Sequence, residues 1–157
     1  QMDRFLMMVR VGYPTRQEER QIVDRATSSL PVKVEPVATL EEIQKARSVV
    51  RDIYMDDRVK DYIVDVVFAT REPAQKGLKE LASLIEYGAS PRASIALALA
   101  ARAHAFLRHR GYVTPEDVKA IGPDVLRHRM VLSYEAEAEE VTAEQIVRKV
   151  FEVVEVP

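Results

Sequence analysis

Arg92 is the first residue whose type and position suggest chemistry. It follows Ser90, a suitable N-cap, and Pro91, which fits the first helical position because its missing N–H needs no partner there. A cation in the first turn of a helix is disfavoured by about 0.3–1 kcal/mol, because the helix dipole is positive at that end. A bound anion reverses that effect, and free backbone N–H groups beside a guanidinium suit a phosphate. Arg92 is therefore a candidate phosphate contact, although local chemistry alone slightly favours the alternative, an ion pair with a nearby carboxylate.

Arg4 is the second candidate, beside Asp3 and just before the apolar run Phe5–Val11. Local chemistry alone favours a salt bridge between Arg4 and Asp3, or a solvated charge. The apolar run is nearly continuous, as expected for a strand that is covered on both faces. Few later segments resemble strands, so we expect its sheet to be built by residues on the N-terminal side. Left without that sheet, residues 1–13 are expected to self-associate or to be disordered, or else to fold onto the helices.

Glycine spacing excludes the two common phosphate-binding loops from this chain. The five glycines stand alone, at positions 12, 77, 88, 111 and 122. Neither GxxxxGK[ST] nor GxGxxG can be written anywhere in the sequence. A phosphate that Arg92 contacts must therefore be held by a different polypeptide segment.

Metal and hydrolytic sites are not predicted. None of the three histidines, His104, His109 and His128, has a second histidine three or four residues away, as a helical metal site would require. Ser90 and Ser94 have no recognisable histidine and carboxylate partners for a catalytic triad. Ser90 is already accounted for as an N-cap.

A basic face across residues 92–129 gives an alternative function. Residues 92–130 hold seven Lys or Arg against three Asp or Glu, in a chain whose net charge is −2. Helix, turn and helix with arginines on both is typical of many DNA-binding proteins, so a stand-alone module that binds protein or nucleic acid is possible. The acidic balance and the 6% aromatic content count against nucleic acid. Arginines at helix C-termini, here Arg108, Arg110, Arg127 and Arg129, are also what the dipole favours.

The periodicity and caps predict a mainly α-helical bundle. Capping boxes at Thr15/Glu18, Thr39/Glu42 and Thr142/Gln145, and caps at Asp56 or Asp57, Ser90 and Thr114, each start a helix. We place a linker and domain boundary at residues 30–37, which hold two prolines. The helix from Pro91 to about His109 is expected to bury Ile95, Leu99, Ala103, Phe106 and Leu107 and to stop at Gly111. Gly122-Pro123 is expected to interrupt the helix that follows Thr114.

Composition narrows the class of protein. The chain has 157 residues, of which 47% are hydrophobic, enough for a packed core. It has no cysteine, which excludes disulfides and thiolate metal sites. No apolar run approaches the roughly 20 residues of a membrane helix, and the N-terminus lacks the order of a signal peptide. We expect a globular, cytoplasmic protein without membrane insertion.

Together these motifs resemble the C-terminal portion of MoxR-type AAA+ ATPases. The resemblance rests on QMDRF, on GYPTRQEE after the apolar run, and on GASPRASIALALAARAHAFLRHRGYVTPEDVKAIGPDVLRHRM. It covers essentially the whole chain, and generic helical bundles do not share this order of motifs. The family's fold implies that residues 1–30 are the last strand and helix of the αβα nucleotide-binding core. Residues 31–157 would then be the helical lid domain.

The resemblance also implies roles for both arginines. The arginine of DRF matches Arg4, which would be an arginine finger that acts in trans on the γ-phosphate held by a neighbouring subunit. The arginine of GASPRAS matches Arg92, which would be the sensor 2 residue and contact the ATP phosphates in cis. Ser90 and Pro91 belong to the same cofactor-binding segment.

The protein implied by the resemblance is an ATP hydrolase that uses ATP and Mg²⁺. It would assemble into a ring, expected to be a hexamer, and couple hydrolysis to chaperone-like remodelling or maturation of partner proteins. Proteins with a von Willebrand factor A domain are the expected partners. The Walker A lysine and the Walker B acidic pair are not found in this sequence, so the chain alone should not hydrolyse ATP.

Overall fold

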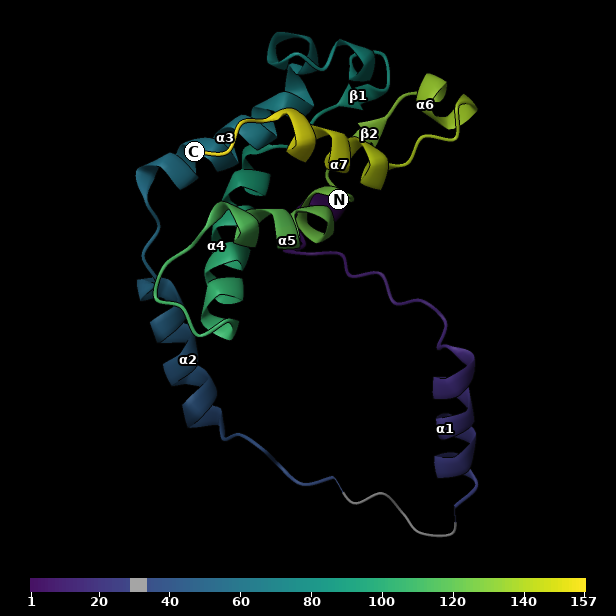
Figure 1. Ribbon diagram of the computed structural model, residues 1–157, viewed down its shortest axis with the longest axis vertical. Coiled ribbons are helices and arrows are strands. Elements are labelled where there is room, and N and C mark those ends of the chain that lie inside the picture. Colours follow the sequence, from purple (N-terminus) through teal and green to yellow (C-terminus); the bar gives the residue numbers. More distant parts are fainter. Residues whose placement is uncertain (29–33) are drawn as a thin grey trace.

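The computed structural model describes residues 1–28 and 34–157, and the fold is mainly α-helical, as predicted (Figure 1). The α-helices are α1 (Arg16–Ala26), α2 (Leu40–Asp52), α3 (Asp57–Arg71), α4 (Pro91–Leu107), α5 (Pro115–Leu126), α6 (Tyr134–Ala138) and α7 (Ala143–Val153). The short elements are the 3-10 helices η1 (Met2–Arg4), η2 (Pro73–Lys76) and η3 (Lys79–Leu81), and the strands β1 (Ile85–Tyr87) and β2 (Val131–Leu132), which pair antiparallel. The linker expected at residues 30–37 lies partly outside the described residues. None of the helices in the described part of the chain combines the length and the apolar character required to cross a bilayer.

Local capping signals set the helix starts. The three predicted capping boxes all form: the Thr15, Thr39 and Thr142 side chains accept from the N3 backbone, and the N3 side chain accepts from the cap backbone. Thr114 and Asp117 make a fourth box at the start of α5. Asp56 rather than Asp57 caps α3. These contacts span three residues or fewer in sequence, which is why the sequence predicts them well.

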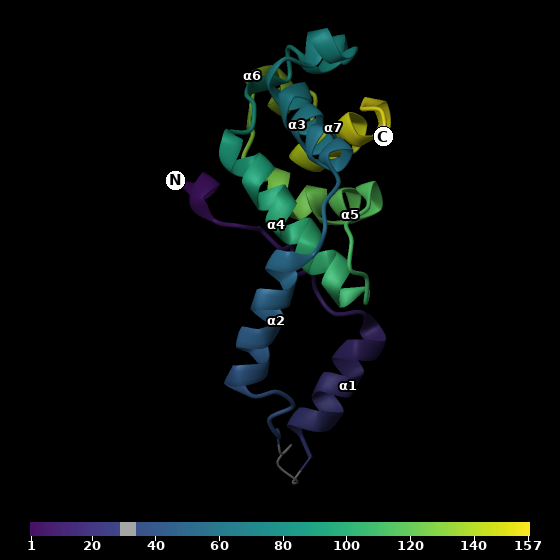
Figure 2. The same ribbon diagram turned by 90° about the vertical axis from the view of Figure 1, so that its left-hand side faces the viewer.

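The core lies where α3, α4, α5 and α7 pack together (Figure 2). Each of these helices contributes fully buried side chains, among them Val66, Val67, Leu97, Val118, Val125, Ile146 and Val150. Two of the three residues predicted to face inward from α7, Ile146 and Val150, are buried, whereas Val153 is exposed.

The buried face of α4 was predicted wrongly. Ile95, Leu99 and Leu107, expected in the core, are exposed. The buried positions are instead Ala93, Ala96, Leu97, Ala100, Ala101 and Ala105. Small side chains shorten the distance at which two helices can pack. The alanine face therefore lets α4 approach its neighbours closely and leaves its bulky residues outside the core.

Two predicted helix ends also differ from the structure. α4 ends at Leu107, and His109 rather than Gly111 adopts the left-handed conformation, with φ of 56°. The Arg110 N–H closes this end by donating to the Ala105 carbonyl at 3.0 Å.

α5 continues through Gly122 and Pro123 without a break, because buried residues on both sides of this pair hold it in the core. Gly122 is required for close packing: a Cβ there would overlap the ring of Phe151.

Residues 5–11 do not form the predicted strand, because no strand pairs with them among the described residues. The segment runs across the helical body instead, and the Met8 N–H donates to the Asp124 carbonyl at 2.8 Å (Figure 2). Met7 packs against the core, whereas Phe5, Leu6 and Val9 remain exposed. Of the outcomes expected for an unpaired apolar segment, folding onto the helices is the one that the structure has.

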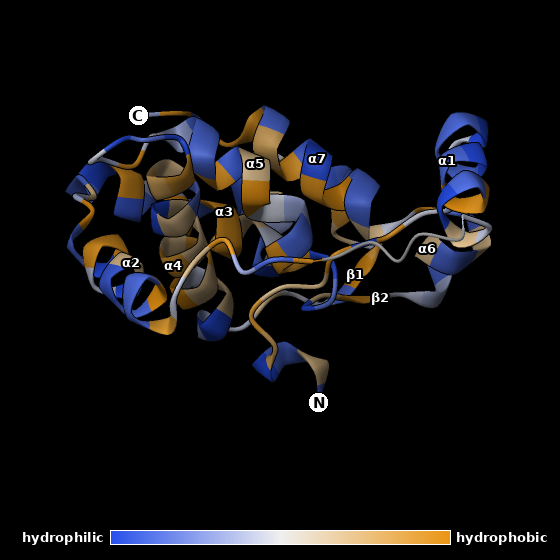
Figure 3. Ribbon diagram, turned by 90° about the horizontal axis from the view of Figure 1, so that it is seen from below, coloured by the Kyte–Doolittle hydropathy of each residue, from blue (hydrophilic) through white to orange (hydrophobic). Residues whose placement is uncertain are grey.

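Helices α1 and α2 extend away from the helical body (Figure 1). Neither has a buried residue, and Ile22, Val23, Leu40 and Ile43 are exposed. Figure 3 shows that both helices contain hydrophobic positions, drawn in orange.

Candidate functional site

The two arginines singled out in the sequence line one pocket. The pocket has a volume of about 310 Å³ and lies between η1, the segment after it, α4 and the end of α5. Its lining residues are Asp3, Arg4, Leu6, Arg92, Ile95, Ala96, Leu99 and Arg129. Ile95 and Leu99, the bulky residues that α4 does not bury in the core, form part of its wall. The tertiary structure therefore brings together Arg4 and Arg92, which the sequence separates widely.

Arg92 lies in the first turn of α4 with its side chain 65% exposed. The Ser90 hydroxyl accepts from the Arg92 backbone N–H at 3.2 Å, and Pro91 occupies the first helical position, as predicted. The first turn of α4 has no acidic residue, whereas those of α1, α2, α3, α5 and α7 all have one or more. The negative charge next to the positive end of the α4 dipole therefore comes from outside the helix, from the Asp3 carboxylate, which accepts from the Ser90 hydroxyl.

The ion pair expected as the alternative for Arg92 is also present, with Asp3, but the distance between the charged groups is long. Arg92 Nη1 lies 4.0 Å from Asp3 Oδ2. An ion pair at that distance on an exposed side chain is weak. Arg92 is thus free to exchange Asp3 for another anion.

Arg4 is exposed, and its guanidinium lies 5.7 Å from the centre of the Phe5 ring. The salt bridge expected between Arg4 and Asp3 is not among the ion pairs of the described residues. The Asp3 carboxylate instead accepts from the Ser90 hydroxyl at 2.9 Å. Arg4 therefore lines the pocket with an exposed guanidinium that has no ion pair among the described residues.

Arg129 is the residue of this pocket that the sequence did not identify as functional. Its side chain is 2% exposed, and Nε lies 3.3 Å from Asp3 Oδ1. Its Nη atoms donate to backbone carbonyls at four positions: Asp3, Phe5, Leu6 and Val125. Burial lowers the pKa of Arg129, an effect that Asp3 opposes, and an arginine remains charged at any physiological pH. In the sequence it is only one of several arginines near a helix end.

Arg127 and His128 extend this hold on the N-terminal segment. Arg127 Nη1 donates to the Met8 carbonyl at 2.8 Å, and His128 Nε2 lies 3.1 Å from the Phe5 carbonyl oxygen. Arg127 also pairs with Asp124 at 2.8 Å and with Glu144 at 3.2 Å. Three consecutive basic residues therefore fasten an extended segment to the helical body.

A second carboxylate network lies in the turn between α4 and α5. Asp117 is fully buried, and its carboxylate accepts from the Arg110 guanidinium at 2.8 Å and from the Thr114 N–H at 2.8 Å. His104 Nδ1 lies 2.6 Å from Asp117 Oδ1. Burial would raise the pKa of Asp117, but hydrogen bonds from Arg110, Thr114 and His104 lower it below its usual range.

These contacts remove much of the basic face proposed as an alternative binding surface. Arg110, Arg127 and Arg129 all point into ion pairs or carbonyls of this chain. Within the described residues, no group of three or more His, Cys, Asp or Glu is placed to hold a metal ion.

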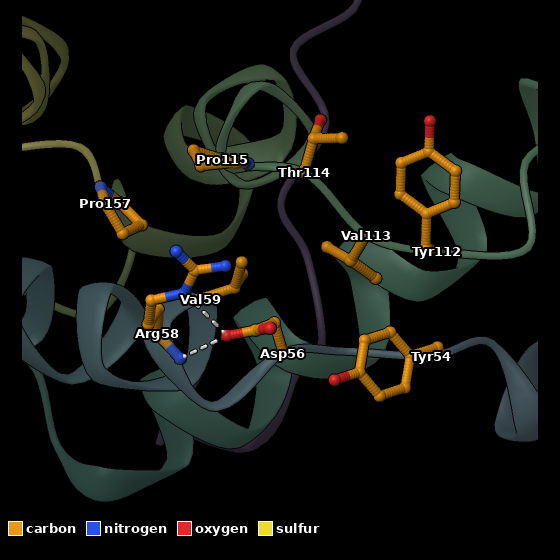
Figure 4. Close-up of a pocket in the computed structure, with 9 residues that line it drawn as sticks. All are labelled: Tyr54, Asp56, Arg58, Val59, Tyr112, Val113, Thr114, Pro115 and Pro157. Atoms are coloured by element: carbon orange, nitrogen blue, oxygen red, sulfur yellow. Dashed lines mark hydrogen bonds and ion pairs between the residues drawn. The ribbon is translucent and has the colours of Figure 1, made fainter.

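A separate pocket of about 300 Å³ lies between the start of α3 and the loop before α5 (Figure 4). Tyr54 and Tyr112 lie on one side of it, and the two segments are joined by hydrogen bonds from Tyr54 N–H to the Gly111 carbonyl at 3.0 Å and from Val113 N–H to the Tyr54 carbonyl at 2.9 Å. Its one arginine, Arg58, pairs with Asp56 at 3.1 Å. None of the predicted site residues lines this pocket.

The chain is similar to known proteins of one family. The model of the AAA lid domain matches residues 80–150. The chain is 40% identical over 157 residues to Chaperone MoxR1 of Mycobacterium tuberculosis, covering all of this chain and 41% of that protein. It is 31% identical over 168 residues to Protein MoxR of Methylorubrum extorquens, covering 99% of this chain and 49% of that protein.

A solved structure has the same fold. The crystal structure of a "putative ATPase" from Cytophaga hutchinsonii superposes with a TM-score of 0.94 at 36% identity, covering 99% of this chain and 47% of that one. The chain thus spans about half the length of the relatives it matches. It belongs to the MoxR-type AAA+ ATPases, of which it represents the C-terminal portion with the AAA lid domain.

Proposed function

We propose that this chain supplies the two phosphate-facing arginines of a MoxR-type ATPase. Arg92 acts as the sensor 2 residue and contacts the phosphates of ATP bound in the same subunit. Arg4 acts as the arginine finger and reaches the γ-phosphate of ATP bound in the neighbouring subunit. The observation that supports the proposal is that both guanidinium groups are exposed and held at most by a long ion pair, with Arg92 in a first helical turn that has no acidic residue.

These roles suit the chemistry of phosphoryl transfer. Catalysis of that reaction is mostly positioning and stabilisation of charge on the phosphoryl oxygens, and an arginine finger contributes about 10³–10⁵ in rate. An exposed guanidinium that is held by no ion pair, or only by a long one, can donate several hydrogen bonds to those oxygens. ATP and Mg²⁺ would be held chiefly by the nucleotide-binding core, because the Asp3 carboxylate in this pocket is already used by Ser90 and Arg129.

The division into two parts follows from the same proposal. Residues 1–30 would be the end of the nucleotide-binding core and residues 31–157 the lid domain. The absence of any buried residue in α1 supports it, because an amphipathic helix buries its apolar face against another surface and the helical body does not provide one for α1. That surface would be the rest of the ATPase or an adjoining subunit.

The intact protein would work in the cytoplasm as a ring, most simply a hexamer, because an arginine finger acts across a subunit boundary. ATP hydrolysis would drive chaperone-like remodelling of partner proteins, with von Willebrand factor A domain proteins as the proposed class. The name of one relative, Chaperone MoxR1, supports the chaperone-like role.

Single substitutions in the full-length protein that contains this chain test both roles. Arg4→Ala should lower kcat for ATP hydrolysis by about 10³ or more, because the transition-state charge loses its partner. Arg92→Ala should lower kcat/KM by about 10- to 100-fold, the effect of losing a hydrogen bond between two charged groups. Arg58→Ala, in the other pocket, is the matched control and should leave both constants unchanged. ATPase rates equal to wild type in both site variants would refute the proposal.

A further inference from the structure

Asp3 occupies the junction between the two arginines of the site. One carboxylate oxygen, Oδ2, accepts from the Ser90 hydroxyl at 2.9 Å and lies 4.0 Å from Arg92 Nη1. The other, Oδ1, lies 3.3 Å from Arg129 Nε. Arg4 is the next residue in the chain. Asp3 therefore contacts Ser90, the N-cap of the helix that contains Arg92, and is also the neighbour of Arg4 in the sequence.

The backbone of this segment is held by hydrogen bonds that do not involve the Asp3 carboxylate. The Nη atoms of Arg129 donate to the carbonyls of Asp3, Phe5 and Leu6, and Arg127 holds that of Met8. A change in the contacts of the Asp3 carboxylate can therefore reorient the exposed side chain of the adjacent Arg4 without detaching the segment. The carboxylate is the adjustable part of this junction.

Two atoms of the junction are not hydrogen-bonded. Asp3 Oδ1 and Arg129 Nε are both shielded from solvent, and neither has a hydrogen-bond partner among the described residues. They face each other at 3.3 Å as an ion pair without hydrogen-bond geometry. Buried polar atoms are seldom left in this state, and such exceptions call for an explanation. A carboxylate divided between two arginines explains it.

We propose that Asp3 is a positioning residue that couples Arg92 to Arg4, by competing with the nucleotide phosphate for Arg92. The inference rests on the function proposed above. A phosphate has more charge than a carboxylate, and the contact between Asp3 and the exposed Arg92 is long, so the phosphate displaces Asp3. Asp3 then turns towards Arg129, and the position of Arg4 changes with it. Occupancy of one ATP site is thereby signalled to the arginine that acts on the neighbouring site.

Such coupling must be reciprocal. If ATP at Arg92 changes the position of Arg4, engagement of Arg4 by the neighbouring γ-phosphate must change the affinity for ATP at Arg92 by the same factor. The Asp3 carboxylate would have two states: in one it is bound to Ser90 beside Arg92, and in the other it is bound to Arg129 alone.

The test is Asp3→Asn in the full-length protein that contains this chain, with ATP hydrolysis measured over a range of ATP concentrations. The amide keeps the size of the side chain and can still accept from Ser90, but it no longer competes for Arg92 as an anion. We expect KM for ATP to fall about two- to fivefold, as suits the loss of a weak ion pair. We expect kcat to fall as well, because Arg4 loses its coupling. A purely structural role would instead raise KM or leave it unchanged.

Three further variants complete the experiment. Asp3→Glu restores the charge and should restore wild-type constants. Asp56→Asn is the matched control, since that carboxylate is 37% exposed against 35% for Asp3, pairs with an arginine and keeps its N-cap function as asparagine. In the Arg92→Ala background, Asp3→Asn should no longer change KM, because the guanidinium for which Asp3 and the phosphate compete has been removed.

The outcomes separate the two proposals. Wild-type rates in Arg4→Ala and Arg92→Ala would refute the proposed function. Loss of activity in those variants, together with an unchanged or raised KM in Asp3→Asn, would overturn the coupling role alone. Hydrogen exchange of residues 1–13 gives a second measurement: a non-hydrolysable ATP analogue should alter it in wild type and not in Asp3→Asn, and an equal response in both would also overturn the coupling role.

Discussion

Asp117 and Asp3 are both carboxylates that meet an arginine and a helix N-terminus, yet the two regions differ in burial and in range. Asp117 is fully buried, and its partners His104, Arg110 and Thr114 lie 13, 7 and 3 residues away in sequence. The Asp3 side chain is 35% exposed, and its partner Ser90 lies 87 residues away. The first network closes a turn, whereas the second joins remote segments.

A carboxylate paired with an arginine can stabilise the fold, as at Asp117, or remain able to exchange partners, as at Asp3. A fully buried carboxylate must be paired and hydrogen-bonded, so the Asp117 network has one stable arrangement and clamps α4 to α5. A carboxylate at the edge of a pocket can exchange partners at little cost, because water and other anions reach it. We therefore expect substitutions at Asp117 to affect stability and substitutions at Asp3 to affect function.

The largest effect on stability is expected from removal of Arg110, the cationic partner of Asp117. Arg110→Ala leaves Asp117 buried without its cationic partner, a change that typically costs about 3–5 kcal/mol in the free energy of unfolding. Urea unfolding measures it. Arg58→Ala, which removes an exposed pair with Asp56, should cost less than about 1 kcal/mol. Equal effects of the two variants would mean that burial of Asp117 does not determine the strength of its pairing.

The next largest effect is expected at low pH, where protonation of Asp117 should weaken its hydrogen bonds and ion pair. The pKa of Asp117 is lowered in the folded state, so its contribution to stability is complete above the unfolded value, about 3.9, and is lost as pH falls through the folded value. The free energy of unfolding should therefore decrease below about pH 4. Urea unfolding between about pH 2 and pH 6 measures this, and Asp117→Asn should show a flatter acid dependence than wild type. An identical dependence in both would contradict the assignment.

A smaller effect on global stability than that of Arg110→Ala is expected at Arg129. In Arg129→Ala the segment of residues 3–8 can detach and become solvated, so its carbonyls do not remain buried without partners. We expect about 1 kcal/mol in the free energy of unfolding, the net value of a typical hydrogen bond. The clearer signature is local: the Met8 amide, which donates to the Asp124 carbonyl, should exchange faster while amides in the core do not. Unchanged exchange at Met8 would show that Arg129 does not hold this segment.

The helix starts illustrate what could be predicted. Capping boxes such as Thr39 with Glu42 involve residues three apart, and both contacts of this box form. The buried face of α4 illustrates the opposite. Its sequence has a bulky stripe that includes Ile95 and an alanine stripe that includes Ala101, and helical periodicity fits either one. Only the neighbouring helices decide which stripe is buried, and they favour the alanines because small residues allow closer packing.

Four features could be predicted from the sequence alone: the helix starts, the family, the absence of a phosphate-binding loop from this chain and the position of Arg92 in a first helical turn. All of these depend on residues that are close in sequence or on an extended motif. The tertiary structure decided that Arg4 and Arg92 share a pocket, that Arg129 is turned inward, and that Asp3 lies between them. Contacts across 87 to 126 residues leave no local pattern, because they depend on how the helices pack and not on the propensities of neighbouring residues.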